Sequence, residues 1–341
     1  MKIGIVTYYK AINNGAFLQA YCLKHFLDEI LGGNARFVPF SDDIIAKDIL
    51  KGIKNPLKFI NVLKRYYAIS KMQKKELLEG MRNEYYDLVV VGSDEVWNIC
   101  NKVFTMENLA TGLNSHLYCT YAVSLGNTSE SNTFPLTFDK ELDKFTNISV
   151  RDDNSKKVIA QKSGKDISIH LDPVFLCDIP HSLKHRTRKP YIMIYGGITE
   201  IKIIQELQFY AKNNGVDIIA VDTFNSWCKT VTSKDPFDFV DYIREAECVV
   251  TNMFHGTMLS ILLKKRFITI LTEARSKKMS YAIRAFGVEN HTINQSELVN
   301  NPKYLISIIE KPLNNQSIDS VILCERKKAA DYFLNVKVGE D

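Results

Sequence analysis

Short runs of apolar residues alternate with longer amphipathic stretches along the chain. In the first half the β-branched runs predict six strands, at residues 3–7, 36–39, 88–92, 118–122, 148–150 and 167–170. Residues 16–30 carry apolar side chains on one stripe at helical spacing, which predicts a helix after the first strand. This alternation is typical of a parallel sheet flanked by helices.

The second half repeats the alternation after a polar, basic stretch at residues 178–189, which we interpret as a linker. Strands are predicted at residues 191–195, 217–221, 248–251 and 267–271, and helices at 199–213, 236–245, 255–263, 279–286 and 324–334. The pattern predicts two Rossmann-like α/β domains, residues 1–178 and 190–312, whose parallel sheets face each other across a cleft. We expect residues 313–341 to form a helical tail that packs back on the first domain.

Length and composition set limits on the class of protein. A chain of 341 residues fits two domains, and 45% apolar with 24% charged residues is ordinary for a globular protein. No apolar run is long enough to span a bilayer and no signal peptide is visible, so we expect a cytoplasmic protein. The seven scattered cysteines suggest neither a disulfide framework nor a metal site. A net charge of +5 does not indicate nucleic-acid binding.

Basic residues are concentrated in one segment, residues 44–82. Ten Lys and Arg there face only three acids, and apolar residues recur at rough helical spacing, so we predict a basic amphipathic helical insert in the first domain. Two interpretations stay open: a helical flap in solvent, or peripheral contact with an anionic membrane surface.

Two loops of the first half carry candidate ligand-binding groups directly after predicted strands. Asn14 and Gly15 open the first helix, where backbone N–H groups suit anions or sugar hydroxyls, although Asn13 and Asn14 can equally well be turn and cap residues. Asp94, Trp97 and Asn98 follow the strand at 88–92. A carboxylate, an indole and an amide are groups that bind sugars. Asp94 can also act as a helix cap.

Two further loops carry candidate catalytic groups. Arg151 follows the strand at 148–150 and offers a fork of donors for carboxylate or phosphate, with a surface ion pair as the alternative. Asn252, His255, Gly256 and Thr257 follow the strand at 248–251, where a histidine can donate a proton near neutral pH. Asn252, Gly256 and Thr257 are predicted to bind substrate, since Gly256 permits close backbone approach and the Thr257 hydroxyl can cap the helix or bind. In isolation such a histidine is more often structural. A basic loop is expected at residues 275–278.

The order of these motifs resembles the polysaccharide pyruvyl transferase family. The resemblance runs from residue 2 to about residue 290 and rests on seven motifs. They are Asn14-Gly15-Ala16 with Leu18-Gln19-Ala20-Tyr21, Gly92-Ser93-Asp94 with Trp97-Asn98, Tyr121-Ala122-Val123-Ser124-Leu125-Gly126, Ser149-Val150-Arg151, Leu171-Asp172-Pro173, Val249-Val250-Thr251-Asn252 and Phe254-His255-Gly256-Thr257.

The resemblance implies a fold similar to the GT-B glycosyltransferases and transfer of pyruvate from phosphoenolpyruvate to sugar hydroxyls as a ketal. It implies that Arg151, His255 and Lys278 hold phosphoenolpyruvate. The sequence shows no metal-binding cluster and the proposed chemistry needs none, so we expect no metal and no further cofactor. Some members carry an Arg two residues before the His, where this chain has Met253.

In the corresponding mechanistic hypothesis, His255 protonates C3 or orients the phosphate. Asp94 and Asn14 hold the acceptor, with Asp94 as a base. The acceptor would be a sugar of a cell-surface polysaccharide or its lipid-linked precursor. The alternatives are a nucleotide-sugar glycosyltransferase on the same scaffold and a non-catalytic glycan-binding protein.

Overall fold

The computed structural model describes residues 1–40, 56–182 and 189–338. The start of the predicted basic insert (44–55), much of the predicted linker (183–188) and the end of the predicted tail (339–341) lie outside the described residues. The chain divides into two compact units. Unit 1 comprises residues 1–48, 70–178 and 322–341, and unit 2 comprises residues 49–69 and 179–321.

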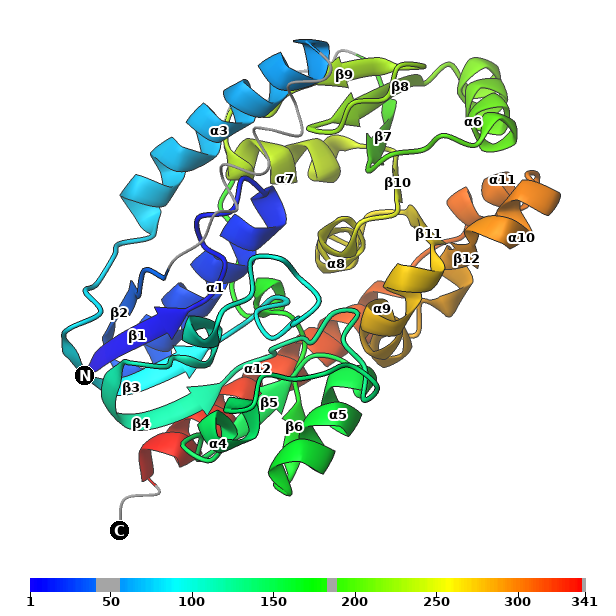
Figure 1. The fold of residues 1–341 in the computed structure, drawn as a ribbon. Helices are drawn as coiled ribbons and strands as arrows, with labels where there is room; N and C mark the ends of the chain where they lie inside the picture. The colour runs from blue at the N-terminus through cyan, green and yellow to red at the C-terminus, as the bar shows by residue number, and fades with distance from the viewer. Residues whose placement is uncertain (41–55, 183–188, 339–341) are drawn as a thin grey trace. The chain divides into compact units, whose positions relative to one another are not determined.

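Unit 1 contains a parallel four-stranded sheet in the order β2-β1-β3-β4 (Figure 1). Its strands are β1 (Lys2–Val6), β2 (Asn34–Phe37), β3 (Tyr85–Val91) and β4 (Asn114–Thr120). A short parallel pair, β5 (Ile148–Val150) and β6 (Ile167–Ile169), is joined to this sheet through single bridges such as Val123 to Val150. All six strands that the sequence predicts for this half are present, with their ends shifted by a few residues.

Helices of unit 1 begin and end at residues with a clear physical role. The helix α1 (Asn14–Leu31) starts because the Asn13 side chain accepts hydrogen bonds from Gly15 N and Ala16 N, at 2.8 and 3.3 Å. It ends at Gly32, which adopts the left-handed conformation that glycine tolerates best. Other helices that lie wholly in the described part of this unit are α4 (Phe138–Leu142), α5 (Asp153–Ser163) and the 3₁₀ turns η1 (Met106–Leu109) and η2 (Pro173–Phe175).

Unit 2 contains a parallel six-stranded sheet in the order β12-β11-β10-β7-β8-β9. The strands are β7 (Tyr191–Tyr195), β8 (Asp217–Val221), β9 (Lys229–Val231), β10 (Cys248–Thr251), β11 (Phe267–Leu271) and β12 (Thr292–Asn294). The helices are α6 (Ile201–Asn214), α7 (Pro236–Glu245), α8 (Phe254–Leu262), α9 (Glu273–Phe286), α10 (Gln295–Asn300) and α11 (Tyr304–Ile309), with the 3₁₀ turn η3 (Glu289–His291).

One expectation for unit 2 is wrong. The predicted basic loop at residues 275–278 is part of the first turns of α9, which begins at residue 273 rather than 279. The polar composition of these turns hides the helix, because only the later part of α9 carries the regular buried positions Met279, Ala282, Ile283 and Phe286. The edge strands β9 and β12 were also not predicted, because their three residues each are mostly exposed or half-buried and form no apolar run.

Two long helices belong to both units. The helix α3 (Pro56–Glu76) has residues 56–69 in unit 2 and 70–76 in unit 1. The helix α12 (Asn315–Val338) has residues 315–321 in unit 2 and 322–338 in unit 1. In unit 1, the Tyr332 hydroxyl donates to Thr120 O at 2.7 Å, and the Glu325 carboxylate accepts from Leu171 N at 2.7 Å. Among the described residues no helix is long and apolar enough to cross a membrane.

Candidate active site

Loops at the carboxyl ends of several strands are joined side by side in unit 1. The Thr7 hydroxyl, after β1, donates to Ser93 O at 3.0 Å, after β3. The backbone of Asp94 accepts from Ser124 N at 2.9 Å, and Arg151 N donates to Val123 O at 3.0 Å. The strand order therefore brings Asp94 and Arg151, separated by 56 residues in the sequence, to one edge of the unit.

An arginine lies between two carboxylates at this edge. Arg151 Nη1 contacts Asp172 Oδ2 at 2.9 Å, and Arg151 Nη2 contacts Asp94 Oδ1 at 3.4 Å. The Arg151 and Asp172 side chains are 2% and 0% exposed, whereas the Asp94 side chain is 19% exposed. Asp94 is thus the member of this Asp94–Arg151–Asp172 triad that a ligand can reach most easily.

The triad is held by its surroundings. Asp94 has a φ of 71°, an unusual conformation for a residue with a side chain, and such residues cluster at functional sites. Beside Arg151, the Asp152 carboxylate caps α5 by accepting from Ser155 N at 2.8 Å and also binds the Ser124 hydroxyl at 2.6 Å. The arginine is therefore fixed at the start of a capped helix.

The charge of Arg151 is balanced inside unit 1. Burial disfavours the charged guanidinium, but Asp94 and then Asp172 outweigh it and raise the pKa of Arg151 above its usual value. An anionic ligand at Arg151 must therefore compete with two carboxylates. The sequence alone indicated Arg151 as an anion-binding group and gave Asp172 no role; the structure makes Asp172 its closest ion-pair partner.

Two side chains near Asp94 have structural roles that the sequence did not reveal. Trp97 was predicted to offer a flat face to a sugar, but it is fully buried, packs against Phe138 and Phe145, and donates from Nε1 to Asn108 O at 3.1 Å. Asn98 uses its amide within the loop, donating to Glu95 Oε2 at 2.9 Å and accepting from Cys100 N at 3.1 Å. The structure gives both side chains these contacts within the protein, and substrate contact by either stays a prediction.

The loop after β1 is also engaged with the protein. Gly15 N, predicted to bind substrate, is bonded to the Asn13 side chain, and Asn14 is only 1% exposed. The helix-cap interpretation applies here, and Asn13 rather than Asn14 supplies the cap. A ligand cannot use the Gly15 N–H without breaking that cap.

In unit 2 a glycine allows α8 to lie close to the sheet. A methyl group at Gly256 would overlap Thr251 Oγ1 and lie 2.8 Å from Tyr195 Cδ1. Thr251 Oγ1 is itself bonded, donating to Tyr195 O at 2.6 Å and accepting from Met253 N at 3.0 Å. The close approach inferred at Gly256 is thus to its own sheet, which seats the first turn of α8 directly after β10.

His255 and Lys278 lie on neighbouring helices of unit 2. His255 is in the first turn of α8 and 9% exposed, and Lys278 is part-exposed on α9. The helices contact through Thr257 Oγ1 and Met279 Sδ, 3.9 Å apart. Thr257 is fully buried and bonds to Thr269 Oγ1 at 2.8 Å, so its hydroxyl joins α8 to β11, and its substrate contact stays a prediction. Asn252 is exposed enough for a ligand but already donates to Gly197 O at 2.9 Å.

Comparison with known proteins now decides the family. A family model described as polysaccharide pyruvyl transferase matches residues 13–273, about three quarters of the chain. The chain belongs to the polysaccharide pyruvyl transferase family. The resemblance noted in the sequence is confirmed, and the matched region contains Asp94, Arg151 and His255. A search among curated proteins finds no significant match.

Solved structures show which fold this pyruvyl transferase family member has. Anabaena Alr3699/HepE in complex with UDP is 10% identical, has a TM-score of 0.54 and aligns over 98% of this chain and 100% of its own. MnaA of S. aureus, also with UDP, is 10% identical, has a TM-score of 0.50 and aligns over 98% and 97%. At this identity the likeness concerns the fold alone, which is the predicted GT-B type with two Rossmann-like domains.

Each unit of this pyruvyl transferase family member has a pocket of its own. In unit 2 a cavity of about 660 Å³ lies at the carboxyl ends of β11 and β12. Its polar lining consists of hydroxyl and amide side chains and one acid: Glu200, Thr272, Ser276, Asn294, Gln295, Ser296 and Asn300. Hydroxyl and amide groups with one carboxylate suit a hydroxyl-rich ligand better than an anion.

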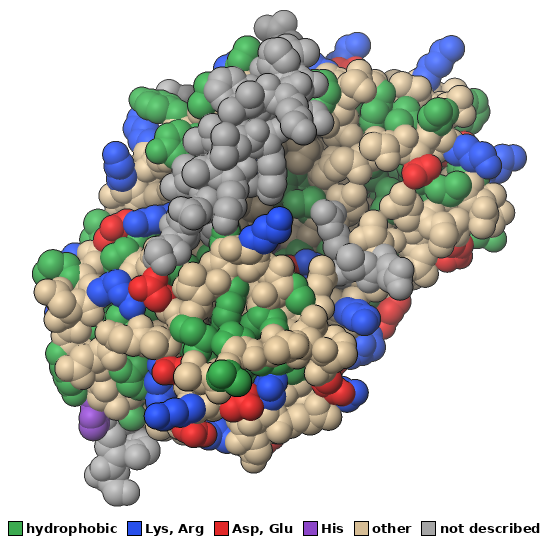
Figure 2. Space-filling view, viewed as in Figure 1, with side chains coloured by type: hydrophobic (Ala, Val, Ile, Leu, Met, Phe, Trp, Pro, Cys, Tyr) green, Lys and Arg blue, Asp and Glu red, His purple; other side chains and the backbone are tan. Residues whose placement is uncertain are grey.

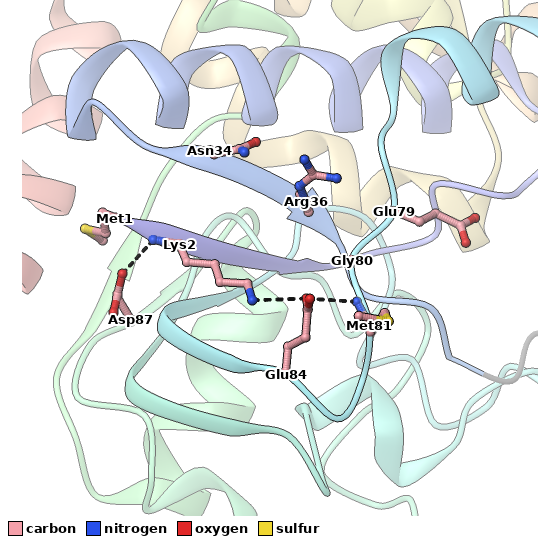
Figure 3. A pocket seen from close by; sticks show the side chains of 9 residues that line it. All are labelled: Met1, Lys2, Asn34, Arg36, Glu79, Gly80, Met81, Glu84 and Asp87. Carbon is pink, nitrogen blue, oxygen red and sulfur yellow. Dashed lines mark hydrogen bonds and ion pairs between the residues drawn. The ribbon is translucent and has the colours of Figure 1, made fainter.

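The pocket of unit 1 lies beside the first residues of β1 and β2 (Figure 3), whereas Asp94 follows the carboxyl end of β3. It has a volume of about 820 Å³, and the residues that line it are Met1, Lys2, Asn34, Arg36, Glu79, Gly80, Met81, Glu84 and Asp87. Lys2 is used within the protein there, since its backbone N donates to Asp87 at 2.6 Å and its Nζ pairs with Glu84 at 3.3 Å. None of the predicted site residues lines it. Among the described residues no cluster of three or more acids, histidines or cysteines is placed to hold a metal ion.

Proposed function

We propose that this protein transfers pyruvate from phosphoenolpyruvate to two hydroxyls of a sugar, forming a ketal on a cell-surface polysaccharide or its precursor in the cytoplasm. The observation that carries this proposal is the family match over residues 13–273. The matched region contains the Asp94–Arg151–Asp172 triad of unit 1 and the first turn of α8, with His255, in unit 2. The geometry supports it, since one unit offers an accessible carboxylate and the other a histidine beside a helix that bears a lysine.

The reaction needs an acid, a base and cationic groups. Protonation of C3 of phosphoenolpyruvate makes C2 electrophilic, and a sugar hydroxyl then adds to C2. The second hydroxyl displaces phosphate from the same carbon and closes the ketal. One of the two hydroxyl protons restores the acid, and the other leaves with the phosphate, so atoms and charges balance.

The residues divide these tasks by their environment. His255 is the proposed acid, and Lys278 on the adjacent helix stabilises the phosphate or carboxylate of the donor. Asp94 is the proposed base for the sugar hydroxyl, because it is the exposed member of its triad. Arg151 acts mainly as a positioning residue, since Asp172 and Asp94 occupy its guanidinium. This assignment moves Arg151 away from the direct donor-binding role that the family resemblance implied.

The proposal is tested with phosphoenolpyruvate and a panel of lipid-linked and nucleotide-linked sugars, by phosphate release and by the mass gain of a ketal-linked pyruvate. We expect His255→Gln to lower phosphate release by roughly 10²–10⁴-fold, the usual contribution of a general acid. His181→Gln is the control, because that ring is 68% exposed in the same unit. Full activity of His255→Gln with an acceptor that supports turnover contradicts the assignment.

A second candidate is a glycosyl transfer from a nucleotide sugar. It is favoured by the hydroxyl- and amide-lined pocket of unit 2, with Glu200 at its edge, and by the UDP in two neighbours of the same fold. Calorimetry with UDP and with phosphoenolpyruvate separates the two. Tight UDP binding that Glu200→Gln weakens, without phosphoenolpyruvate binding, selects the second candidate. Saturable sugar binding without turnover of either donor instead selects the glycan-binding alternative.

A further inference from the structure

The helix α3 has an inner face that is fixed to the rest of the protein. Ile69 is 1% exposed, and Gln73 Nε2 donates to Tyr9 O at 2.7 Å and to Ala11 O at 3.3 Å. Arg65 Nη1 donates to Asp222 O at 3.1 Å. These contacts lie on one side of the helix, so its rotation about its own axis is set.

The opposite face of α3 combines exposed apolar and basic side chains. Ile60, Leu63 and Tyr67 are 48%, 40% and 73% exposed. With 3.6 residues per turn these three share a face with four exposed lysines. We call this set the α3 stripe: Ile60, Leu63, Lys64, Tyr67, Lys71, Lys74 and Lys75. In Figure 2, green and blue side chains lie side by side at the upper left, where Figure 1 draws α3.

The composition of the α3 stripe differs from that of a helix face made only for water. An exposed helix face normally carries charged side chains of both signs, whereas this stripe has two aliphatic side chains, one tyrosine and four lysines. Glu76, which pairs with Lys75 at 2.9 Å, is the only acid within α3. The face is therefore apolar toward its N-terminal half and uniformly basic toward its C-terminal half.

We infer that the α3 stripe binds the surface of an anionic lipid bilayer. Aliphatic and aromatic side chains enter the boundary between headgroups and acyl chains, while lysines reach lipid phosphates from the same face. Tyrosine is enriched at that depth because its ring is apolar and its hydroxyl is polar. A protein partner of matching chemistry would need a continuous acidic and apolar groove. A bilayer supplies both features over any length, which suits a stripe along a whole helix.

The inference stands apart from the proposed reaction, because it concerns where the protein resides and not what it transfers. Under this inference, residues 60–75 of the basic segment lie in the plane of the membrane and do not form a helical flap in solvent. Binding can be measured without substrate. Loss of catalytic activity and loss of membrane binding are therefore separate outcomes.

The test is co-sedimentation of the full-length protein with vesicles of phosphatidylcholine alone or with phosphatidylglycerol added. We expect binding only to the anionic vesicles, and weakening as salt is raised. Each lysine near an anionic surface contributes about a fivefold gain in affinity, so Lys64, Lys71 and Lys74 changed together to Gln should lose roughly a hundredfold. Lys202, Lys212 and Lys303 changed to Gln, exposed lysines outside α3, are the control with the same charge change.

The apolar residues of the α3 stripe are tested with a separate variant. Ile60, Leu63 and Tyr67 changed together to Ser should abolish sedimentation with anionic vesicles, whereas Phe209→Ser, at 58% exposure on α6, should not. Unchanged denaturation midpoints show that the variants fold. Two results overturn the inference. In the first, the stripe and control variants bind anionic vesicles equally well. In the second, the original protein binds no vesicles and forms a dimer that the stripe variant does not form, which assigns the stripe to self-association.

Discussion

Asp172 Oδ2 lies 2.9 Å from Arg151 Nη1, and both side chains are almost completely buried. The second oxygen of Asp172 accepts from Val174 N at 3.1 Å and so caps the turn η2. One carboxylate therefore neutralises the arginine and fixes the chain after β6. This pair, rather than a ligand, accounts for the orientation of Arg151.

Asp172→Asn should destabilise unit 1, because it removes the negative charge that lies 2.9 Å from the buried Arg151 guanidinium. Breaking one partner of a buried ion pair typically costs about 3–5 kcal/mol of unfolding free energy. Chemical denaturation of the variant measures the loss. The control is Asp139→Asn, which breaks the exposed pair with Lys162 at 3.1 Å and should cost less than about 1 kcal/mol. An equal effect of the two changes would show that the Arg151 pair has no special role.

Asp94→Asn should lower catalysis far more than stability. Asparagine tolerates the positive φ of 71° and keeps the Oδ1 acceptor for Glu95 N at 2.8 Å, but it removes a charge 3.4 Å from the buried Arg151, so the unfolding free energy should fall by up to about 3–5 kcal/mol, the cost typical of a broken buried ion pair. Loss of a general base should lower phosphate release by roughly 10²–10⁴-fold. Single-turnover measurement with phosphoenolpyruvate and acceptor checks this. Normal turnover by the folded variant removes Asp94 from the mechanism.

The sequence predicted most strands and the two-domain class, because buried parallel strands consist of short runs of apolar residues. It also placed Asp94, Arg151 and His255 after strands, where the structure has them. What it missed depends on contacts between distant residues. The pairing of Arg151 with Asp172 depends on the position of β6 beside β5, and the residues next to Arg151 in the sequence do not predict it.

The packing roles of Trp97 and Thr257 could not be predicted from the sequence for a related reason. Both types of side chain bind sugars when exposed and fill cores when buried, and the residue type does not reveal which. Trp97 is covered by Phe138 and Phe145 from a separate segment, and Thr257 by Thr269 of the next strand. For α9, the hydrophobic period becomes regular only after Lys278, which is why its first turns were predicted as a loop.

Gly256→Ala should disturb the seat of α8. The added methyl overlaps Thr251 Oγ1, whose hydroxyl is already bonded to Tyr195 O, so we expect a loss of about 1–3 kcal/mol in unfolding free energy. Thermal or chemical denaturation measures it. Gly197→Ala is the matched control, because no atom lies within 4 Å of its added methyl, and its effect should stay within about 0.5 kcal/mol. If both changes are neutral, α8 does not depend on this close approach.

Glu325 on α12 should make stability depend on pH. Burial raises the pKa of its carboxyl from 4.5 to about 7, despite the hydrogen bond from Leu171 N at 2.7 Å. Because the folded-state pKa lies above the unfolded one, the contribution is fully present below pH 4.5 and is lost as pH rises through about 7. Unfolding free energy should therefore fall by about 3 kcal/mol across this window.

The variant Glu325→Gln isolates that contribution, since an amide oxygen accepts the Leu171 hydrogen bond and carries no charge. The variant should be more stable than the original protein at pH 8 and of similar stability at pH 4.5. Comparing the two proteins at each pH cancels the opposite contribution of His170. Burial lowers the pKa of that imidazole to about 3, so its contribution is present above pH 6.5 and is lost as pH falls toward 3. A difference in unfolding free energy that does not change between pH 4.5 and 8 would mean that Glu325 stays ionised in the folded protein, and that α12 is anchored to unit 1 through a charged carboxylate.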